Sequence, residues 1–359
     1  MTPQDRPPGE SRGHLAKAFR WSPAPLDPLD ALAAALAMAT PVLAGVLLGA
    51  APAGFLAALG ALALTGPVAA PDCATHARRL GVLFASIGAA VCMAAIASGH
   101  GAATGVALVL LASAAALVGG ASRPLAEATT RFIVFLAIAA SALDNHASRA
   151  SFVALTLAGA LWAAFITLVA GALARAMRNT PSAEATPQRA APTARQQFAR
   201  WRKTLRRLDG WRFTLRLAAC LSCAYGLHAL WPNHHLPWIA VTAVILLQRQ
   251  VEPLPVRTTQ RALGVAGGVC LAAVLTAGEP PHALLVMGVA LLAGLRPLLR
   301  VKNYLAYSAI MTPLVVLMID AGAPPTWSLL RDRLVATLIG AALVLAVNAV
   351  ALRGESIET

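Results

Sequence analysis

Charged residues are scarce in this chain: Asp, Glu, Lys and Arg together make up only 12% of its 359 residues. An ordinary soluble domain has about a quarter of its residues charged. Apolar residues account for 58% of the chain, and the mean hydropathy is +0.68. This composition excludes an ordinary soluble globular domain and predicts a protein embedded in a membrane.

Cysteines are also few, and the five that are present do not have the pattern of a disulfide framework. Cys220 and Cys223 have the spacing of a redox motif, but they lie in an apolar run without a βαβ context. We therefore interpret them as helix-packing residues. The first 28 residues contain no apolar core before a small-residue cleavage site, so no secretory signal is predicted.

Motifs of enzymes and of metal sites are absent from the sequence as well. There is no hydrolytic triad, phosphate-binding loop or dinucleotide fingerprint. His228, His234 and His235 lie close together, but the adjacent pair would diverge in a helix or strand, and no Cys, Asp or Glu lies nearby. We expect no enzymatic activity, no metal site and no cofactor.

The chain does contain a series of twelve apolar runs. Several reach the roughly 20 residues that a helix needs to cross a 30 Å hydrocarbon layer. The runs at 54–70, 132–143 and 237–248 are weaker, and the last two would span only about 18 Å as helices. We expect these short runs to cross with polar residues drawn in at their ends, or to pack as broken helices around a cavity. The twelve runs are 29–50, 54–70, 80–98, 102–120, 132–143, 151–174, 212–230, 237–248, 262–277, 282–299, 303–319 and 334–352.

The positions of the basic residues predict how these runs are oriented. In a layout with twelve spans, 26 of the 29 Lys and Arg residues fall on one side, and only Arg149, Arg331 and Arg333 fall on the other. Cytoplasmic loops of membrane proteins carry an excess of Lys and Arg, so both termini are predicted to be cytoplasmic. The formal net charge of +14 indicates nucleic acid only in a soluble protein; here we expect contact with anionic lipid and no nucleic-acid binding.

An internal duplication divides the runs into two sets of six. The segment from Gly54 to Gly81 and the segment from Pro237 to Gly264 correspond without a gap at a constant offset of 183 residues. Six is an even number, so both halves enter the membrane in the same direction, as parallel repeats about an axis along the membrane normal. The predicted fold class is an all-α polytopic membrane protein of about 12 transmembrane helices. The predicted parts are an N-terminal tail (1–28), a first repeat (29–174), a basic cytoplasmic linker (175–211), a second repeat (212–353) and a C-terminal tail (354–359).

The linker contains the pattern of a basic amphipathic helix. Such a helix lies on the inner leaflet, with its apolar side chains among the lipids. A calmodulin-target helix looks similar, but the adjacent membrane spans favour the lipid interpretation. The apolar positions are Phe198, Trp201, Leu205, Leu208 and Trp211, and the interleaved basic residues are Arg202, Lys203, Arg206 and Arg207.

Polar and ionisable residues near the apolar runs are candidates for function, because burying charge in hydrocarbon costs several kcal/mol. His228 and Asp320 lie near the outer ends of their runs, and Arg331 and Arg333 lie on the outer side against the inside bias. Two interpretations stay open for the arginines. They are neutralised by Asp332 and Asp320 at the interface, or they form a rim that attracts an organic anion.

Thr312 and Pro313 lie in the middle of the eleventh run, where a proline removes a backbone hydrogen bond and kinks a helix. One interpretation is local packing. The other is a transport site at the midplane, where freed carbonyl groups face a cavity.

Short motifs in the second half resemble, in their order, the fusaric acid resistance protein-like family, also called the aromatic acid exporters. The resemblance covers residues 212–352 well and residues 29–174 more weakly, through the duplicated segment. The motifs are Leu236-Pro237-Trp238, Arg261-Ala262-Leu263-Gly264, Asn303-Tyr304, Thr312-Pro313, Arg331-Asp332-Arg333-Leu334 and Gly340-Ala341-Ala342.

This resemblance implies a bacterial inner-membrane exporter of aromatic or other amphipathic organic acids, coupled to the proton gradient. Some family members resemble subunits of three-part efflux assemblies, so a periplasmic adaptor is an expected partner beside the bilayer and a small organic anion. Many exporters of the family carry a large soluble domain, whereas only the linker joins the two halves here. The substrate-path candidates are Thr312, Pro313, Tyr304, His228, Asp320, Arg331 and Arg333, and the residues of the family-motif loop are Arg257, Arg261 and Gly264.

Other functions also fit the sequence. An anion channel needs no proton carrier, and carboxylates are scarce within the runs; some relatives of the family are similar to plant anion channels. A membrane assembly or lipid-organising protein would also have few polar groups in its core. A major facilitator fits the number of spans, but the loop from Pro71 to Arg79 lacks the Gly- and Asp-containing signature. Gly264, Gly267 and Gly268 allow close helix contacts within one chain or in a homo-oligomer.

Overall fold

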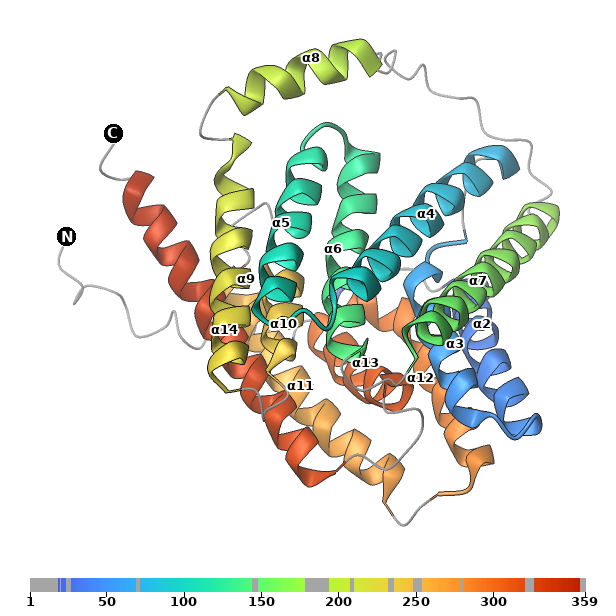
Figure 1. The fold of residues 1–359 in the computed structure, drawn as a ribbon. Helices are drawn as coiled ribbons and strands as arrows, with labels where there is room; N and C mark the ends of the chain where they lie inside the picture. The colour runs from blue at the N-terminus through green and yellow to red at the C-terminus, as the bar shows by residue number, and fades with distance from the viewer. Residues whose placement is uncertain are drawn as a thin grey trace.

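The computed structural model describes residues 19, 21–23, 27–68, 72–143, 148–177, 194–206, 210–231, 236–247, 254–277, 280–319 and 326–355. These residues form 13 helices and no strand, which confirms the all-α class (Figure 1). The helices of the first half are α2 (Pro28–Leu47), α3 (Ala51–Leu64), α4 (Cys73–Ala97), α5 (Ala102–Val118), α6 (Arg123–Leu143) and α7 (Arg149–Met177). They are followed by α8 (Ala194–Leu205), α9 (Arg212–Leu230), α10 (Pro237–Leu246), α11 (Leu254–Thr276), α12 (His282–Lys302), α13 (Tyr304–Ile319) and α14 (Trp327–Glu355).

Each apolar run corresponds to one helix of this series. Within the described ranges, eight helices are long and apolar enough to cross a membrane, and α3, α5, α10 and α13 are shorter apolar helices. Four helices begin seven to nine residues before the expected runs, namely α4 at Cys73, α6 at Arg123, α11 at Leu254 and α14 at Trp327. The longer α6 has 21 residues, whereas its run was expected to begin at residue 132. In contrast, α10 has only 10 residues, or about 15 Å, which is half of a hydrocarbon layer.

Acidic and proline residues explain where two of the helices begin. Asp27 accepts a hydrogen bond from the Leu29 amide, and Pro28 occupies the first position of α2. Before α4, Asp72 accepts hydrogen bonds from the amide and the hydroxyl of Thr75, at 2.6 and 2.7 Å. These two bonds favour the ionised form and lower the pKa of the Asp72 carboxyl.

Helix packing in the first half recurs in the second. α3 packs against α2 and α7, as α10 packs against α9 and α14; α4 packs against α6 and α7, as α11 packs against α13 and α14. Contacts between the halves recur in the same way. α2 packs against α12 of the other half, as α9 packs against α5. α3 packs against α13 of the other half, as α10 packs against α6. The two halves therefore meet around a common centre (Figure 1).

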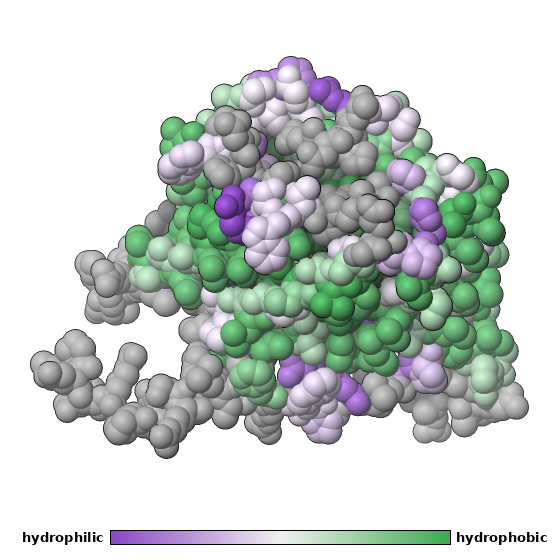
Figure 2. Space-filling model, turned by 90° about the horizontal axis from the view of Figure 1, so that it is seen from below, coloured by the Kyte–Doolittle hydropathy of each residue, from purple (hydrophilic) through white to green (hydrophobic). Residues whose placement is uncertain are grey.

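The helices at this centre differ from those around it. α3, α10, α13 and the C-terminal half of α6 bury most of their residues, and we call them the inner helices. The surrounding helices expose large apolar side chains, for example Leu110 of α5, Leu161 of α7 and Leu291 of α12. Apolar side chains also cover much of the face shown in Figure 2. Such a surface suits a lipid environment, in which exposed apolar side chains carry no penalty.

Two glycines allow α11 to pack closely against α13. A Cβ atom on Gly264 would lie 2.6 Å from the Leu305 carbonyl oxygen, and one on Gly268 would lie 2.5 Å from the Ala309 carbonyl oxygen. Both glycines thus make close helix contacts within one chain. Gly267, between them, has nothing within 4 Å of such an atom.

The basic amphipathic helix expected from Phe198 to Trp211 is met in part by α8, which ends at Leu205. Trp211 lies at the start of α9 instead, and its indole donates to the Leu205 carbonyl at 2.9 Å. Figure 1 shows α8 across the end of the bundle at which α5 and α6 meet and α9 begins. The Trp201 indole donates a hydrogen bond to the Leu117 carbonyl at 3.0 Å, and the rings of Phe198 and Trp201 lie 5.5 Å apart. Leu208 lies outside the described residues.

Candidate functional site

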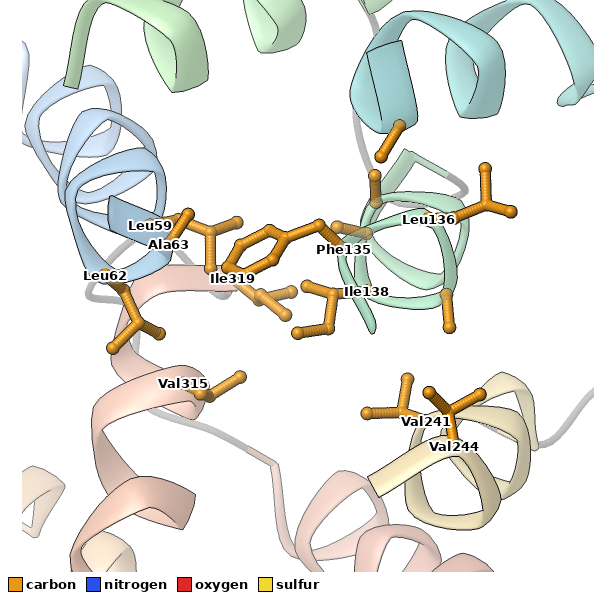
Figure 3. Close-up of a cluster of buried hydrophobic side chains, with 14 of the residues drawn as sticks. Leu59, Leu62, Ala63, Phe135, Leu136, Ile138, Val241, Val244, Val315 and Ile319 are labelled. Atoms are coloured by element: carbon orange, nitrogen blue, oxygen red, sulfur yellow. The ribbon is translucent and has the colours of Figure 1, made fainter. Parts of the chain in front are cut away.

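A cavity of about 630 Å³ lies between the inner helices and the facing parts of α9, α11, α12 and α14. Most of its wall is apolar, and the inner helices bring apolar side chains together at the centre (Figure 3). Figure 3 shows Phe135 extending from α6 toward Ala63 of α3 and Ile319 of α13. Five arginines interrupt this wall, and none of the described residues that line the cavity is acidic. The arginines are Arg131, Arg261, Arg296, Arg300 and Arg333.

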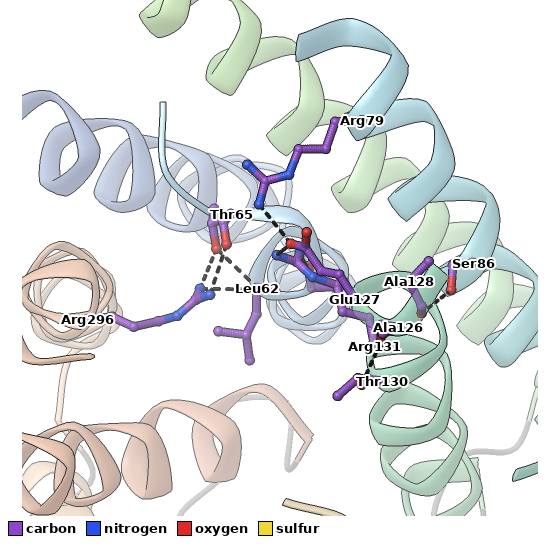
Figure 4. A network of polar contacts seen from close by, with 11 residues as sticks. Leu62, Thr65, Arg79, Ser86, Ala126, Glu127, Ala128, Thr130, Arg131 and Arg296 are labelled. Atoms are coloured by element: carbon purple, nitrogen blue, oxygen red, sulfur yellow. Dashed lines mark hydrogen bonds and ion pairs between the residues drawn. The ribbon is translucent and has the colours of Figure 1, made fainter. Parts of the chain in front are cut away.

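Two of these arginines bind the C-terminal end of α3. Arg296 of α12 donates to the carbonyl oxygens of Leu62 at 3.2 Å and of Thr65 at 3.0 Å, and also to the Thr65 hydroxyl (Figure 4). Arg131 of α6 donates to the Ala63 carbonyl at 2.8 Å. The last carbonyl groups of a helix have no partner within the helix, and an unpaired carbonyl in an apolar interior is costly. We call this pair of arginines with its acceptors the α3 clamp.

One acidic residue lies behind the α3 clamp. Glu127, one turn before Arg131 in α6, lies 2.8 Å from the Arg79 guanidinium and 3.4 Å from that of Arg131 (Figure 4). The carboxylate offsets part of the positive charge there and orients Arg131. Both ion pairs are partly exposed, since the Arg79 and Glu127 side chains are 42% and 39% accessible.

A different arrangement surrounds Arg333, seven residues into α14. Its guanidinium carbon lies 3.6 Å from the centre of the Trp238 ring, and one of its nitrogens donates to the Thr312 carbonyl at 3.2 Å. Thr337, one turn along α14, also lines the cavity. We call Trp238, Thr312, Arg333 and Thr337 the tryptophan pole. A cation over an aromatic face is a stabilising arrangement and holds the guanidinium in a fixed plane.

The other end of the cavity is formed by Arg261, Arg300, Tyr304 and Tyr307, which we call the tyrosine pole. The rings of Tyr304 and Tyr307 stack with centroids 6.0 Å apart, and Arg257 lies 5.1 Å from the Tyr304 ring. The Arg261 Nε atom is buried without a hydrogen-bond partner.

Exposure differs between the two poles. Arg300 is exposed, whereas Arg333 is only 5% exposed and Thr312 only 7%. The cavity is therefore open at the tyrosine pole, where α12 ends and α13 begins, and closed at the tryptophan pole.

The structure brings together four residues that the sequence had singled out: Thr312, Tyr304, Arg333 and Arg261 all line the cavity. The other candidates that the structure describes are not among the residues that line the cavity. Pro313 is buried within α13, Arg257 contacts Tyr304 from α11, and Gly264 packs against α13. Arg331 is 59% exposed and pairs with Asp332 at 3.4 Å, His228 near the end of α9 has a buried Nδ1 without a partner, and Asp320 lies outside the described residues.

Sequence reasoning missed the α3 clamp, Trp238 as a site residue and the tyrosine pole beyond Tyr304 and Arg261. The apolar run predicted at 132–143 leaves Arg131 outside the helix, because the run begins after this charged residue. A signal was present: Pro124 follows Arg123, and proline is favoured in the first turn of a helix. A helix starting there places Arg131 two turns inside α6.

The cavity and its surrounding helices can be compared with known proteins. Neither the curated proteins nor the solved structures gave a match to this chain. A family model described as fusaric acid resistance protein-like matches residues 219–347, which run from within α9 to within α14. Together with the eight membrane-capable helices, this match supports a multi-pass membrane protein with a function related to membrane transport. The match confirms the resemblance of the second half of the chain to the fusaric acid resistance protein-like family.

Proposed function

We propose that this protein transports amphipathic organic anions across the membrane and exports aromatic acids from the cytoplasm. The observation that carries the proposal is the central cavity, whose described lining contains five arginines and no acidic residue. Charged side chains within a membrane protein are costly, and they mark substrate pathways. An anion in the cavity would pair with the arginines, while its ring would contact apolar and aromatic walls.

The helix arrangement supports a transport cycle. We infer two repeats of six helices, α2–α7 and α9–α14, because the packing of the first set recurs in the second. The short helices α3 and α10 would end within the bilayer, as the broken helices of transporters do around their binding sites. In this arrangement both termini and α8 face the cytoplasm of a bacterial cell, and the tyrosine pole opens toward the cytoplasm.

Transport can be measured with purified protein in liposomes. We expect labelled benzoate to accumulate in vesicles that contain the protein and, if export is proton-coupled, to respond to an imposed pH gradient. Arg333→Gln should lower the initial rate at least tenfold, because it removes the guanidinium of the tryptophan pole. Arg331→Gln makes the same change of charge two residues away at an exposed position, and should leave the rate within twofold. Equal accumulation in protein-free vesicles would refute the proposal.

An anion channel is the second candidate. The lining supports it in one respect: without a described acidic residue on its wall, the cavity offers no evident carboxylate to carry a proton. A channel would give currents that follow the reversal potential of the anion and do not depend on the proton gradient.

A membrane-organising protein without transport is the third candidate. It predicts that Thr312→Val and Arg333→Gln leave growth on toxic aromatic acids unchanged.

The partners of the protein are also proposals. The basic residues of α8 and the adjoining Arg206 support contact with the anionic inner leaflet. Those of α8 are Arg195, Arg200, Arg202 and Lys203, and all five are exposed. A periplasmic adaptor and a homo-oligomer rest on the family resemblance and on the small residues of the helices. Crosslinking in intact membranes, followed by mass analysis of the adducts, would test both partners.

A further inference from the structure

We propose that the two poles of the cavity are separate anion-binding subsites, and that the site prefers a rigid aromatic dianion with its charges at opposite ends. This inference rests on the proposed function and specifies its substrate class. The argument depends on which arginines face a ligand, how far apart the poles lie and what separates them.

The α3 clamp is the first step, because it removes two arginines from consideration. Arg296 makes three hydrogen bonds to Leu62 and Thr65, and Arg131 binds Ala63 and Glu127. Arg296 directs these donors at the end of α3, and Arg131 divides its donors between the end of α3 and Glu127 of its own helix. The arginines of the tyrosine pole lie on α11 and α12, and the arginine of the tryptophan pole lies on α14.

Helix register gives the separation of the poles. Gly264 of α11 lies against Leu305 and Ser308, and Gly268 lies against Ala309 and Thr312, so α11 and α13 run in the same direction. Arg261 precedes Gly264 by three residues and is therefore level with Tyr304. Thr312, whose carbonyl binds Arg333, lies eight residues beyond Tyr304, or about 12 Å along α13.

The wall between the poles determines which chemical group fits between the two ends of the ligand. It is formed by apolar side chains of the inner helices, among them Phe135, Val241 and Val315. These side chains cannot satisfy a charged group but contact an aromatic ring well. A ligand that spans the cavity thus needs an apolar middle and an anionic group at each end.

Charge-assisted hydrogen bonds at each end fix the length of such a ligand. A guanidinium–carboxylate contact is about 2.8 Å long, and the planar guanidinium binds a carboxylate in bidentate geometry. Benzene-1,4-dicarboxylate directs its two carboxylates away from opposite ends of the ring, so each can meet one pole. Benzene-1,2-dicarboxylate has the same composition and charge, but both carboxylates point to one side and reach one pole only.

Binding of three acids to the purified protein in detergent tests the inference, with isothermal titration calorimetry as the readout. We expect benzene-1,4-dicarboxylate to bind at least tenfold more tightly than benzoate and than benzene-1,2-dicarboxylate. Arg333→Gln and Arg261→Gln should each reduce the affinity for the 1,4-isomer to that of benzoate. Arg331→Gln should change none of the three affinities more than twofold.

Comparing the two isomers on the unmodified protein keeps the test valid even if a variant fails to fold. Equal affinity for the 1,2- and 1,4-isomers would overturn the two-pole inference, because charge alone would then explain binding. Transport of benzoate would still stand in that case. If none of the three acids binds and labelled benzoate does not accumulate in liposomes, the proposed function fails as well.

Discussion

The α3 clamp and the tryptophan pole both place arginine on the cavity wall, but they use it differently. At the clamp, two guanidinium groups satisfy the carbonyl groups at the end of a 14-residue helix. At the tryptophan pole, Arg333 lies over the Trp238 ring and binds the Thr312 carbonyl of α13, a helix that continues for seven more residues. The comparison teaches that an arginine in a membrane cavity can be part of the fold or part of the binding surface. What it bonds to distinguishes the two.

Removing Arg296 should have the largest effect on stability. Arg296→Ala leaves the Thr65 carbonyl without its arginine donor in an apolar interior, and it leaves the Leu62 carbonyl with only the bond from the Thr65 hydroxyl. A buried unpaired group costs roughly 1–3 kcal/mol. We expect a loss of about 3 kcal/mol or more, measured as a lower unfolding midpoint and a lower folded yield in detergent. Arg300→Ala, one turn along α12 and exposed, is the matched control and should unfold near the midpoint of the unmodified protein. If the two variants unfold together, the α3 clamp does not have the structural role assigned to it.

Close packing of α11 on α13 places the tyrosine pole beside the inner helices, and Gly264→Ala should disturb it. A methyl group there would lie 2.6 Å from the Leu305 carbonyl oxygen, and overpacking costs typically 1–3 kcal/mol. We expect a loss of stability in this range, from thermal unfolding. Gly267→Ala adds the same methyl group on the open face of the same helix and should be neutral or slightly stabilising. If Gly267→Ala loses as much stability as Gly264→Ala, the contact with α13 does not explain the loss at Gly264.

Trp238→Phe tests whether the tryptophan pole belongs to the binding surface. The substitution keeps an aromatic ring beneath Arg333 but weakens the cation–π contact, which is worth roughly 0.5–2 kcal/mol. We expect the affinity for benzoate to fall about threefold with little change in the unfolding midpoint, because Arg333 would be less well oriented. Trp327→Phe, at the exposed start of α14, is the control and should change neither quantity. A large loss of stability without loss of affinity would place Trp238 with the structural residues.

Glu127→Gln should have the smallest effect. Its ion pairs with Arg79 and Arg131 are partly exposed, and exposed pairs contribute at most about 1 kcal/mol. We expect a shift of the unfolding midpoint that is detectable in low salt and absent in high salt, because salt screens such pairs. A large, salt-independent shift would mean that Glu127, and not the Ala63 carbonyl, is the main partner of Arg131.

The sequence was sufficient for the helices and insufficient for the cavity. Long apolar runs are a local signal, so each predicted run corresponds to one helix, and the shortness of α10 was foreseen. The start of α6 was misjudged at Arg131, because charge alone does not tell a loop from a buried helix turn. The bond from Arg296 to Thr65 joins residues 231 apart in the chain, and only the folded packing of α12 near α3 reveals it. Pairing of α3 with α13 and of α10 with α6 was likewise outside the reach of local patterns.

The open and closed ends of the cavity have an electrical consequence. Water that enters at Arg300 would carry the cytoplasmic potential deep into the protein, so most of the membrane voltage would fall across the closed end of the cavity at the tryptophan pole. Each elementary charge that crosses 100 mV gains or loses about 2.3 kcal/mol. In the proposed orientation the cytoplasm is negative, so the resting voltage would itself push a bound anion outward, and a doubly charged ligand would feel that push twice.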